Sequence, residues 1–238
     1  MPIIQSWKLY ETQVRCKRPF IIASGVQDCC HGLLLELVDS QGRSGWGEGV
    51  PLPHLTGETL RGCRSALESV FLPHVLGRDA RQIPLLSREL DKKMMGHTAA
   101  RCALDLAMHD LASQSFGVSP WAYLGGDNRP VATNYSIGLT TPEDAAQQAR
   151  SLVEQDFTCI KLKLGDDYEV DVERVRAVRA AIGPDIHLRV DANEGWNYVQ
   201  ARHFLSRAEG LNLQLLEQPL HRSDWEGMRR LRSLTSIP

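Results

Sequence analysis

Short apolar strands alternate with helices throughout the second half of the sequence. The segments TNYSIGL, CIKLKLG, IHLRVDAN and LQLLEQPL are each followed by a longer stretch with helical spacing of apolar residues. Strict alternation of strand and helix is typical of parallel strands joined by crossover helices. The pattern therefore predicts a (β/α) barrel or a doubly wound sheet for residues 121–238.

Polar residues recur at the carboxyl ends of three of these predicted strands. Lys163, Asp191 and Glu217 each end an apolar run, and they are separated by about one βα unit of roughly 30 residues. In a barrel, the carboxyl ends of the strands form the face that carries the active site. We therefore expect the three side chains to lie at one level of the sheet.

Two lysines stand in the strand CIKLKLG. Side chains two residues apart share a face of a strand, so Lys161 and Lys163 point one way and the neighbouring apolar residues point to the helices. Burial and the mutual repulsion of two ammonium groups would lower their pKa values, which would suit a base near neutral pH. The alternative is that both lysines keep an exposed edge strand soluble.

Asp191 and Glu217 follow apolar strands, where carboxylates seldom serve packing. Two converging carboxylates suit a hard divalent cation, which prefers oxygen ligands. A cation next to a lysine indicates removal of a proton from the carbon beside a substrate carboxylate, with Lys163 as base and Lys161 assisting electrostatically. The alternative is that the carboxylates form salt bridges to Arg189 or to the lysines.

The first half of the sequence has a different order of elements. Residues 3–16 and 31–38 read as strands of a small antiparallel sheet, and residues 56–77 and 98–117 have helical spacing of apolar residues. Strands followed by helices predict an α+β unit over residues 1–120.

Composition excludes several classes of partner. The net charge is −2, which gives no electrostatic footprint for nucleic acid or an anionic membrane. The six cysteines form no C-x-x-C pair and read as reduced, packed thiols. No signal peptide and no apolar run of the roughly 20 residues that span a bilayer is evident, so we expect a soluble, cytoplasmic protein.

The motifs IKLKLG, LRVDANEGW and LLEQPL, together with GWGEGVP and ALDLAMHDLASQSFGVSPWAYLGG, resemble the enolase superfamily in its muconate-lactonizing subgroup. The resemblance covers essentially the whole chain. It implies an α+β capping domain over residues 1–120, followed by the first half of a (β/α) barrel over residues 121–238, and Mg²⁺ as cofactor. It also implies acid/base catalysis by Lys163, electrostatic help from Lys161, and metal ligation by Asp191 and Glu217.

Within that subgroup, TNYSIGLTTPEDAAQQA and GWGEGVPLPHLTGET look most similar to dipeptide epimerases, which invert the α-carbon of a dipeptide's C-terminal residue. The resemblance implies that the loop near residues 19–30 forms a mobile cap over a small-molecule substrate. It leaves a homo-oligomer open. Relatives that act on Ala-Glu dipeptides carry an arginine in this cap, but none occurs between Phe20 and His31. We therefore expect an apolar or cationic substrate side chain, bound by Phe20, Ile22, Asp28, Tyr135 and Asn193.

The sequence contains four βα units, which is half a barrel. The resemblance places the third carboxylate ligand on the next strand and the second catalytic lysine on the strand after that, both beyond residue 238. We therefore expect a truncated copy of a longer enzyme, or a second chain that supplies the missing half. We also expect these 238 residues alone to bind Mg²⁺ weakly and to turn over substrate poorly or not at all. Muconate-type cycloisomerase or o-succinylbenzoate synthase activity, and a non-catalytic assembly module, are the alternative functions.

Overall fold

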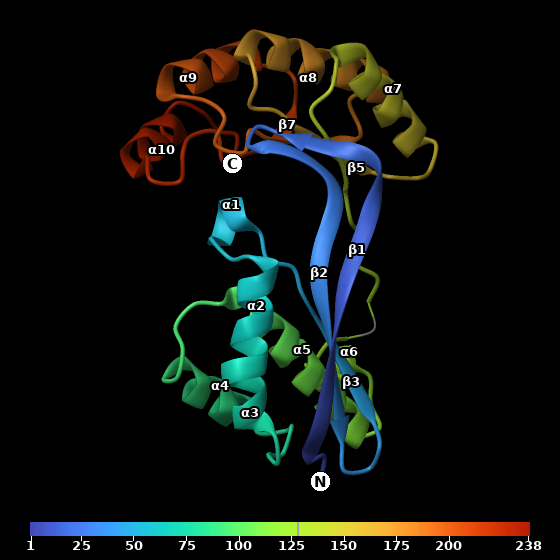
Figure 1. Ribbon diagram of the computed structural model, residues 1–238. Coiled ribbons are helices and arrows are strands. Elements are labelled where there is room, and N and C mark those ends of the chain that lie inside the picture. Colours follow the sequence, from blue (N-terminus) through green and yellow to red (C-terminus); the bar gives the residue numbers. More distant parts are fainter. Residues whose placement is uncertain (128) are drawn as a thin grey trace. The chain divides into compact units, whose positions relative to one another are not determined.

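The structure is a computed structural model that describes residues 1–127 and 129–238 (Figure 1). It divides into two compact units. The first comprises Met1–Arg15 and Cys29–Arg129, and the second comprises Cys16–Asp28 and Pro130–Pro238. Residues 16–28, although they belong to the first hairpin of the chain, therefore group with the βα units.

The first unit is built on a sheet with the strand order β1-β2-β3, where β1 is Ile4–Ile22, β2 is Gly25–Asp39 and β3 is Ser44–Gly49. The two long strands extend well beyond the expected ranges. As a result, residues 19–30 are not a loop, because strand structure continues on both sides of a turn at residues 23–24. We call residues 16–28 the hairpin tip.

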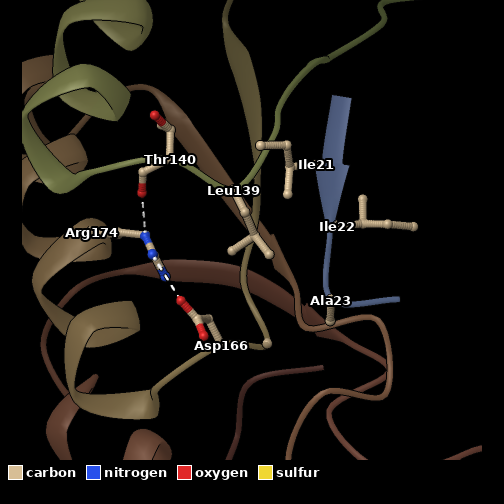
Figure 2. Close-up of a pocket in the computed structure, with 8 residues that line it drawn as sticks. Ile21, Ile22, Ala23, Leu139, Thr140, Asp166 and Arg174 are labelled. Atoms are coloured by element: carbon tan, nitrogen blue, oxygen red, sulfur yellow. Dashed lines mark hydrogen bonds and ion pairs between the residues drawn. The ribbon is translucent and has the colours of Figure 1, made fainter. Parts of the chain in front are cut away.

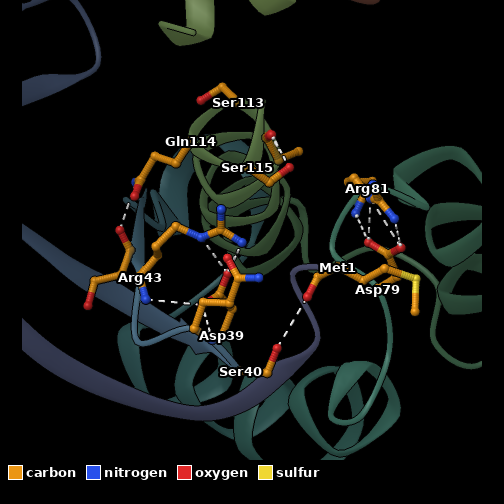
Figure 3. A network of polar contacts seen from close by, with 12 residues as sticks. Met1, Asp39, Ser40, Arg43, Asp79, Arg81, Ser113, Gln114 and Ser115 are labelled. Atoms are coloured by element: carbon orange, nitrogen blue, oxygen red, sulfur yellow. Dashed lines mark hydrogen bonds and ion pairs between the residues drawn. The ribbon is translucent and has the colours of Figure 1, made fainter. Parts of the chain in front are cut away.

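A polar network closes the predicted turn between β2 and β3 (Figure 3). The buried Asp39 carboxylate accepts hydrogen bonds from the amides of Gln41 and Arg43 and from Nε of Arg43. Gln114 donates from Nε2 to the carbonyl oxygen of Ser44 at the start of β3. The Asp, Ser and Gly residues of this turn thus form the hairpin that the sequence predicts.

Helix α5 packs directly on β3, because three glycines give β3 a face without side chains. A Cβ on Gly47 would lie 1.9 Å from the carbonyl oxygen of Ala103, and one on Gly45 would lie 2.5 Å from that of Ala107. The helices of the unit, which include a π-helical turn η1, are α1 Pro53–Thr56, α2 Leu60–Ala66, η1 Leu67–Phe71, α3 Leu72–Val75, α4 Ile83–Asp91, α5 Thr98–Ser115 and α6 Pro120–Tyr123.

The second unit is a parallel sheet, as the alternation of strands and helices predicts. Its strand order is β4-β5-β6-β7. Ile160 and Leu162 of β5 are fully buried in the core on the helix side. Figure 1 shows the helices side by side along one face of this sheet. The elements are β4 Tyr135–Ile137, α7 Pro142–Val153, β5 Cys159–Lys163, α8 Tyr168–Ile182, β6 His187–Asp191, α9 Tyr198–Arg207, β7 Leu213–Glu217 and α10 Trp225–Arg232.

Each of the four helices begins at a capping side chain a few residues after a strand. The side chains of Thr141, Asp167, Asn197 and Asp224 accept a hydrogen bond from a backbone amide in the first turn of α7, α8, α9 and α10. Such caps satisfy amides that have no partner within the helix. The short loops between strand end and cap fix where the side chains at the strand ends lie. No helix in the described residues has the length and apolar character that would let it cross a membrane.

Candidate active site

The register of the parallel sheet brings the predicted polar residues to one level. Lys163 of β5 is the register partner of Asp191 of β6, which is in turn the partner of Glu217 of β7. Register partners on adjacent strands point to the same face of a sheet. The three side chains therefore lie on the face opposite the helices, at the carboxyl edge.

Ion pairs connect these side chains. Nζ of Lys163 lies 2.6 Å from Oδ2 of Asp191, and Nζ of Lys161 lies 3.0 Å from the same oxygen and 2.6 Å from Oε2 of Glu217. The Asp191 side chain is 1% exposed, whereas that of Glu217 is 49% exposed. Asp191 is thus the buried centre of the cluster.

The pKa of Lys161 differs from what the sequence predicts. Burial alone would lower the pKa of Lys161, but its hydrogen bonds with Glu217 and Asp191 outweigh burial and raise that pKa. The expected depression of this pKa is therefore wrong, because each ammonium faces a carboxylate rather than only the other ammonium. Burial would raise the pKa of Asp191, and the hydrogen bonds from Lys163, Lys161 and the Asn193 amide nevertheless hold it below its ordinary value.

The geometry also tests the two alternative interpretations, in which the lysines lie on an edge strand and the carboxylates form salt bridges. The strand that carries both lysines is not an edge strand, because β5 lies between β4 and β6. The carboxylates pair with the lysines, as one alternative predicted. Arg189 does not take part, because its guanidinium donates to Gln214 and Asn134 instead.

The donor set fits a hard cation. Oxygens of Asp191 and Glu217 both contact Nζ of Lys161, so the two carboxylates converge on one position for positive charge. Oδ1 of Asn193, two residues beyond Asp191, is a buried oxygen with no hydrogen-bond partner among the described residues. Carboxylate and amide oxygens are ligands that Mg²⁺ and Ca²⁺ accept. The donor set is limited to these two carboxylates and the amide oxygen, because the described residues contain no cluster of three or more Asp, Glu, His or Cys side chains that could hold a metal.

Asn193 is held beside Asp191 by its backbone. Its amide donates to Oδ1 of Asp191 at 2.9 Å, and its φ of 46° lies in the left-handed region. Glu194 and Gln218 also have positive φ, at 68° and 38°. Non-glycine residues in this region store backbone strain, which is common at functional sites.

The other residues predicted to bind substrate lie in different places. Phe20 and Ile22 are partly buried on the hairpin tip, and Asp28 is exposed there. Tyr135 is the register partner of Ile160, so it lies below the level of Lys163 and on the helix face, where its ring contacts Phe157. The structure therefore does not bring Tyr135 to the cluster of lysines and carboxylates.

One residue near the cluster was not predicted from the sequence. Ser136 of β4 is the register partner of Lys161 and is partly buried on the same face of the sheet. The alternation within TNYSIGL is the signal that could have indicated it, since Tyr135 and Ile137 occupy the apolar face. Ser136 replaces Tyr135 as the β4 residue that faces the site.

Family models match both units of the chain. Residues 6–125 match the mandelate racemase / muconate lactonizing enzyme N-terminal domain, and residues 144–238 match the enolase C-terminal domain-like model. Together the two matches cover most of the described residues of each unit.

Curated relatives and solved structures are similar along nearly the whole chain. The hydrophobic dipeptide epimerase of Enterococcus faecalis is 33% identical over 93% of this chain and 62% of its own length. The L-Ala-D/L-Glu epimerase of Bacillus subtilis is 29% identical over 93% of this chain and 61% of its own length. A crystal structure of the dipeptide epimerase from Enterococcus faecalis, complexed with Mg and L-Leu-L-Tyr, has a TM-score of 0.95 at 32% identity and covers 100% of this chain and 66% of that chain.

The chain thus spans 61% and 62% of the length of these two curated relatives. The N-terminal family model nevertheless matches the first half of the chain, and the C-terminal model matches the second half. The chain therefore belongs to the mandelate racemase/muconate lactonizing enzyme family of the enolase superfamily.

Proposed function

We propose that this chain removes the proton from the carbon next to the carboxylate of a dipeptide or N-acyl amino acid, as one half of an epimerisation. The single observation that carries the proposal is the contact between Lys163 and Asp191, with Nζ 2.6 Å from Oδ2. In this contact the amine of Lys163, which can move a proton, lies next to the carboxylate of Asp191, which can hold a cation.

Asp191 and Glu217 are the residues that would hold Mg²⁺. Their side-chain oxygens already converge on Nζ of Lys161. When bound, Mg²⁺ supplies positive charge beside the substrate carboxylate and so stabilises the negative charge that proton removal leaves there. Relatives solved with Mg and a dipeptide support this assignment.

Nζ of Lys163 is the atom that accepts the substrate proton. The residue is mostly buried, so the transfer takes place away from bulk water. Lys161 lies two residues before Lys163 on the same face of β5 and contributes positive charge near the reacting carbon. Asn193 and Ser136 are polar groups that can orient the substrate next to the two lysines.

The relatives also support the substrate class. Their names include L-Ala-D/L-Glu epimerases, a hydrophobic dipeptide epimerase, an L-Lys-D/L-Arg epimerase and an N-succinyl-L-Arg/Lys racemase, so they support a dipeptide or N-acyl amino acid but not one kind of side chain. In this chain the residues before the hairpin turn are Phe20, Ile21, Ile22 and Ala23, and no arginine occurs between Phe20 and His31. We therefore propose a dipeptide whose C-terminal side chain is apolar or cationic rather than acidic.

The test is proton–deuterium exchange at the α-carbon of a dipeptide panel in heavy water with Mg²⁺. We expect Mg²⁺-dependent exchange of the α-proton for deuterium. Lys163→Ala should abolish the exchange. Lys92→Ala, which removes an exposed lysine at the end of α4, should leave it unchanged.

Two outcomes would overturn the proposal. One is exchange that persists at the wild-type rate in Lys163→Ala. The other is a folded wild-type chain that binds Mg²⁺ but exchanges no α-proton from any member of the panel. The panel should contain acidic, apolar and cationic C-terminal residues, so that the substrate class is tested in the same experiment.

A further inference from the structure

A buried carboxylate outside the lysine cluster connects two loops at the carboxyl edge of the sheet. Asp171 lies in the first turn of α8 and is fully buried. Its Oδ2 accepts hydrogen bonds from the amides of Gly165 and Asp166, which follow β5, and from Nε1 of Trp196, which follows β6. Its Oδ1 accepts a hydrogen bond from Arg174.

Arg174 extends this network to the loop after β4. The side chain is 8% exposed and its Nε donates to the carbonyl oxygen of Thr140, while Nη2 lies 3.4 Å from Oδ2 of Asp166. Figure 2 shows the guanidinium between Thr140 and Asp166. One ion pair on α8 therefore fixes the backbone after β4, β5 and β6.

The hairpin tip rests on two of the segments that this pair fixes. The amide of Leu139 donates to the carbonyl oxygen of Ile21 at 2.8 Å. A Cβ on Gly138 would lie 3.2 Å from the backbone of Ile21, and one on Gly165 would lie 2.8 Å from Cβ of Ala23. The tip is thus in backbone contact with residues 138–139, and the side chain of Ala23 lies against Gly165.

A pocket of about 370 Å³ separates the tip from α8. It is lined by Ile21, Ile22 and Ala23 on one side and by Leu139, Asp166 and Arg174 on the other. In the described residues, Arg174 makes its hydrogen bonds to Thr140, Asp166 and Asp171 and none to the tip. Any effect of Arg174 on the tip therefore passes through the loops that it holds.

Stability alone does not account for this pair. Burying a charged pair costs desolvation energy that the attraction between the charges often only balances, so such pairs are better explained by the geometry that they enforce. In agreement, burial raises the pKa of Asp171 in spite of its hydrogen bonds and the nearby Arg174. The geometry enforced here is that of the loops which contact the hairpin tip.

We propose that Asp171 and Arg174 are positioning residues that seat the hairpin tip on the loops after β4 and β5. Arg174 holds the carbonyl of Thr140, next to the Leu139 amide that binds Ile21. Asp171 holds the amides of Gly165 and Asp166, next to the contact with Ala23. The consequence for catalysis, tighter substrate binding under a seated tip, rests on the function proposed above, but the seating itself does not.

The test is hydrogen–deuterium exchange of the 238-residue chain, followed by mass spectrometry of peptides that cover residues 19–24 and 138–141. Arg174→Lys keeps a positive charge beside Asp171, but a single ammonium nitrogen does not reach both Asp171 and Thr140 as the fork of Arg does. We expect both peptides to exchange at least tenfold faster in Arg174→Lys and in Asp171→Asn.

Arg179→Lys is the matched control, because Arg179 lies on the same helix and its guanidinium also makes several hydrogen bonds to loop residues. It donates to the carbonyl oxygens of Leu211, Gly183, Ile186 and Asn212 at the other end of α8. This variant should lower the melting temperature and leave exchange in the tip unchanged. Trp196→Phe removes the indole N–H that donates to Asp171, together with part of the buried ring, and serves as a third variant if the other two fail to fold. We expect it to speed exchange of residues 164–167 and, to a smaller extent, of the tip.

The proposal is wrong if the tip peptides exchange at the wild-type rate in every folded variant, or if Arg179→Lys loosens them as much as Arg174→Lys. A second readout uses the α-carbon exchange reaction, where Arg174→Lys should raise KM about tenfold and change kcat by less than threefold. If no α-carbon exchange occurs at all, the proposed function fails. The exchange of the tip peptides still decides the seating proposal by itself.

Discussion

Lys163 and Asp191 are register partners on adjacent parallel strands, and their side chains meet with Nζ 2.6 Å from Oδ2. The same carboxylate oxygen also contacts Lys161, and the other oxygen accepts the amide of Asn193. The proposed base and the proposed cation ligand are therefore coupled. A substitution of one of them changes the surroundings of the other.

Asp191→Ala should lower the free energy of unfolding by about 3 kcal/mol, because removal of one partner leaves a buried charge uncompensated. Lys163, whose side chain is 11% exposed, would lose its anionic partner. Urea denaturation of the wild type and the variant measures the difference.

Glu217→Gln is the matched control for this effect. The Glu217 side chain is 49% exposed, so water screens its ion pair with Lys161. Exposed pairs contribute between about 0 and 1 kcal/mol, and we expect a loss within that range. Equal losses in the two variants would contradict the role of Asp191 as the buried centre of the cluster.

Lys161→Met should strengthen Mg²⁺ binding by about tenfold, which corresponds to about 1.4 kcal/mol. The physical reason is that Nζ of Lys161 contacts both Asp191 and Glu217, so its positive charge opposes a second cation at those oxygens. Isothermal titration calorimetry of the folded variant measures the change without any substrate. Unchanged or weaker binding would show that the two carboxylates do not hold the ion.

Most of the fold of the second unit was predictable from the sequence, because its pattern is local. Ile160 and Leu162 alternate with Lys161 and Lys163, and this alternation assigns one face of β5 to the helices and the other to the site. Regular spacing of the βα units then sets the level of Asp191. The level of the site residues follows from these two features, whereas the alternation alone leaves a barrel and a doubly wound sheet open and does not fix the strand order that the structure shows.

Other parts were not predictable because they depend on partners that are distant in the sequence. The extent of the hairpin tip depends on the contact of Ile21 with Leu139, which no local pattern indicates. Asp171 reads in the sequence as one of several acidic residues favoured in the first turn of a helix. Only the structure shows that its side chain points inward to Trp196 and Arg174.

The packing of the glycines of GWGEGV is another such case, since no local pattern in the sequence indicates their contact with α5. In the structure Gly47 lies in β3 against the backbone of α5, and a Cβ there would lie 1.9 Å from the carbonyl oxygen of Ala103. Gly47→Ala should therefore lower the free energy of unfolding by about 3 kcal/mol, at the upper end of the usual range for overpacking. Thermal and urea denaturation check this value.

Gly62→Ala provides the comparison for Gly47→Ala. Gly62 lies in α2, and the nearest atom to a Cβ there is Oγ1 of Thr59 at 3.2 Å. Alanine favours a helix over glycine by about 1 kcal/mol, so this variant should be unchanged or slightly more stable. A Gly47→Ala protein as stable as the wild type would mean that α5 does not rest on β3 in this way.

Glu89 should make the stability of the fold depend on pH in the acidic range. Its carboxylate accepts hydrogen bonds from Arg78 and pairs with His74, and these contacts lower the pKa of Glu89 from 4.5 to about 2. A carboxyl whose pKa is lower in the folded state stabilises the fold fully above the unfolded value, and this contribution is lost as the pH falls towards the folded value. Glu89→Gln should therefore show a shallower fall in melting temperature than the wild type between pH 4.5 and 2. Glu209→Gln removes an exposed carboxylate that has no ion pair within the described residues, and it should follow the wild-type curve. A Glu89→Gln curve parallel to the wild type over this range would contradict the predicted coupling of Glu89 to Arg78 and His74.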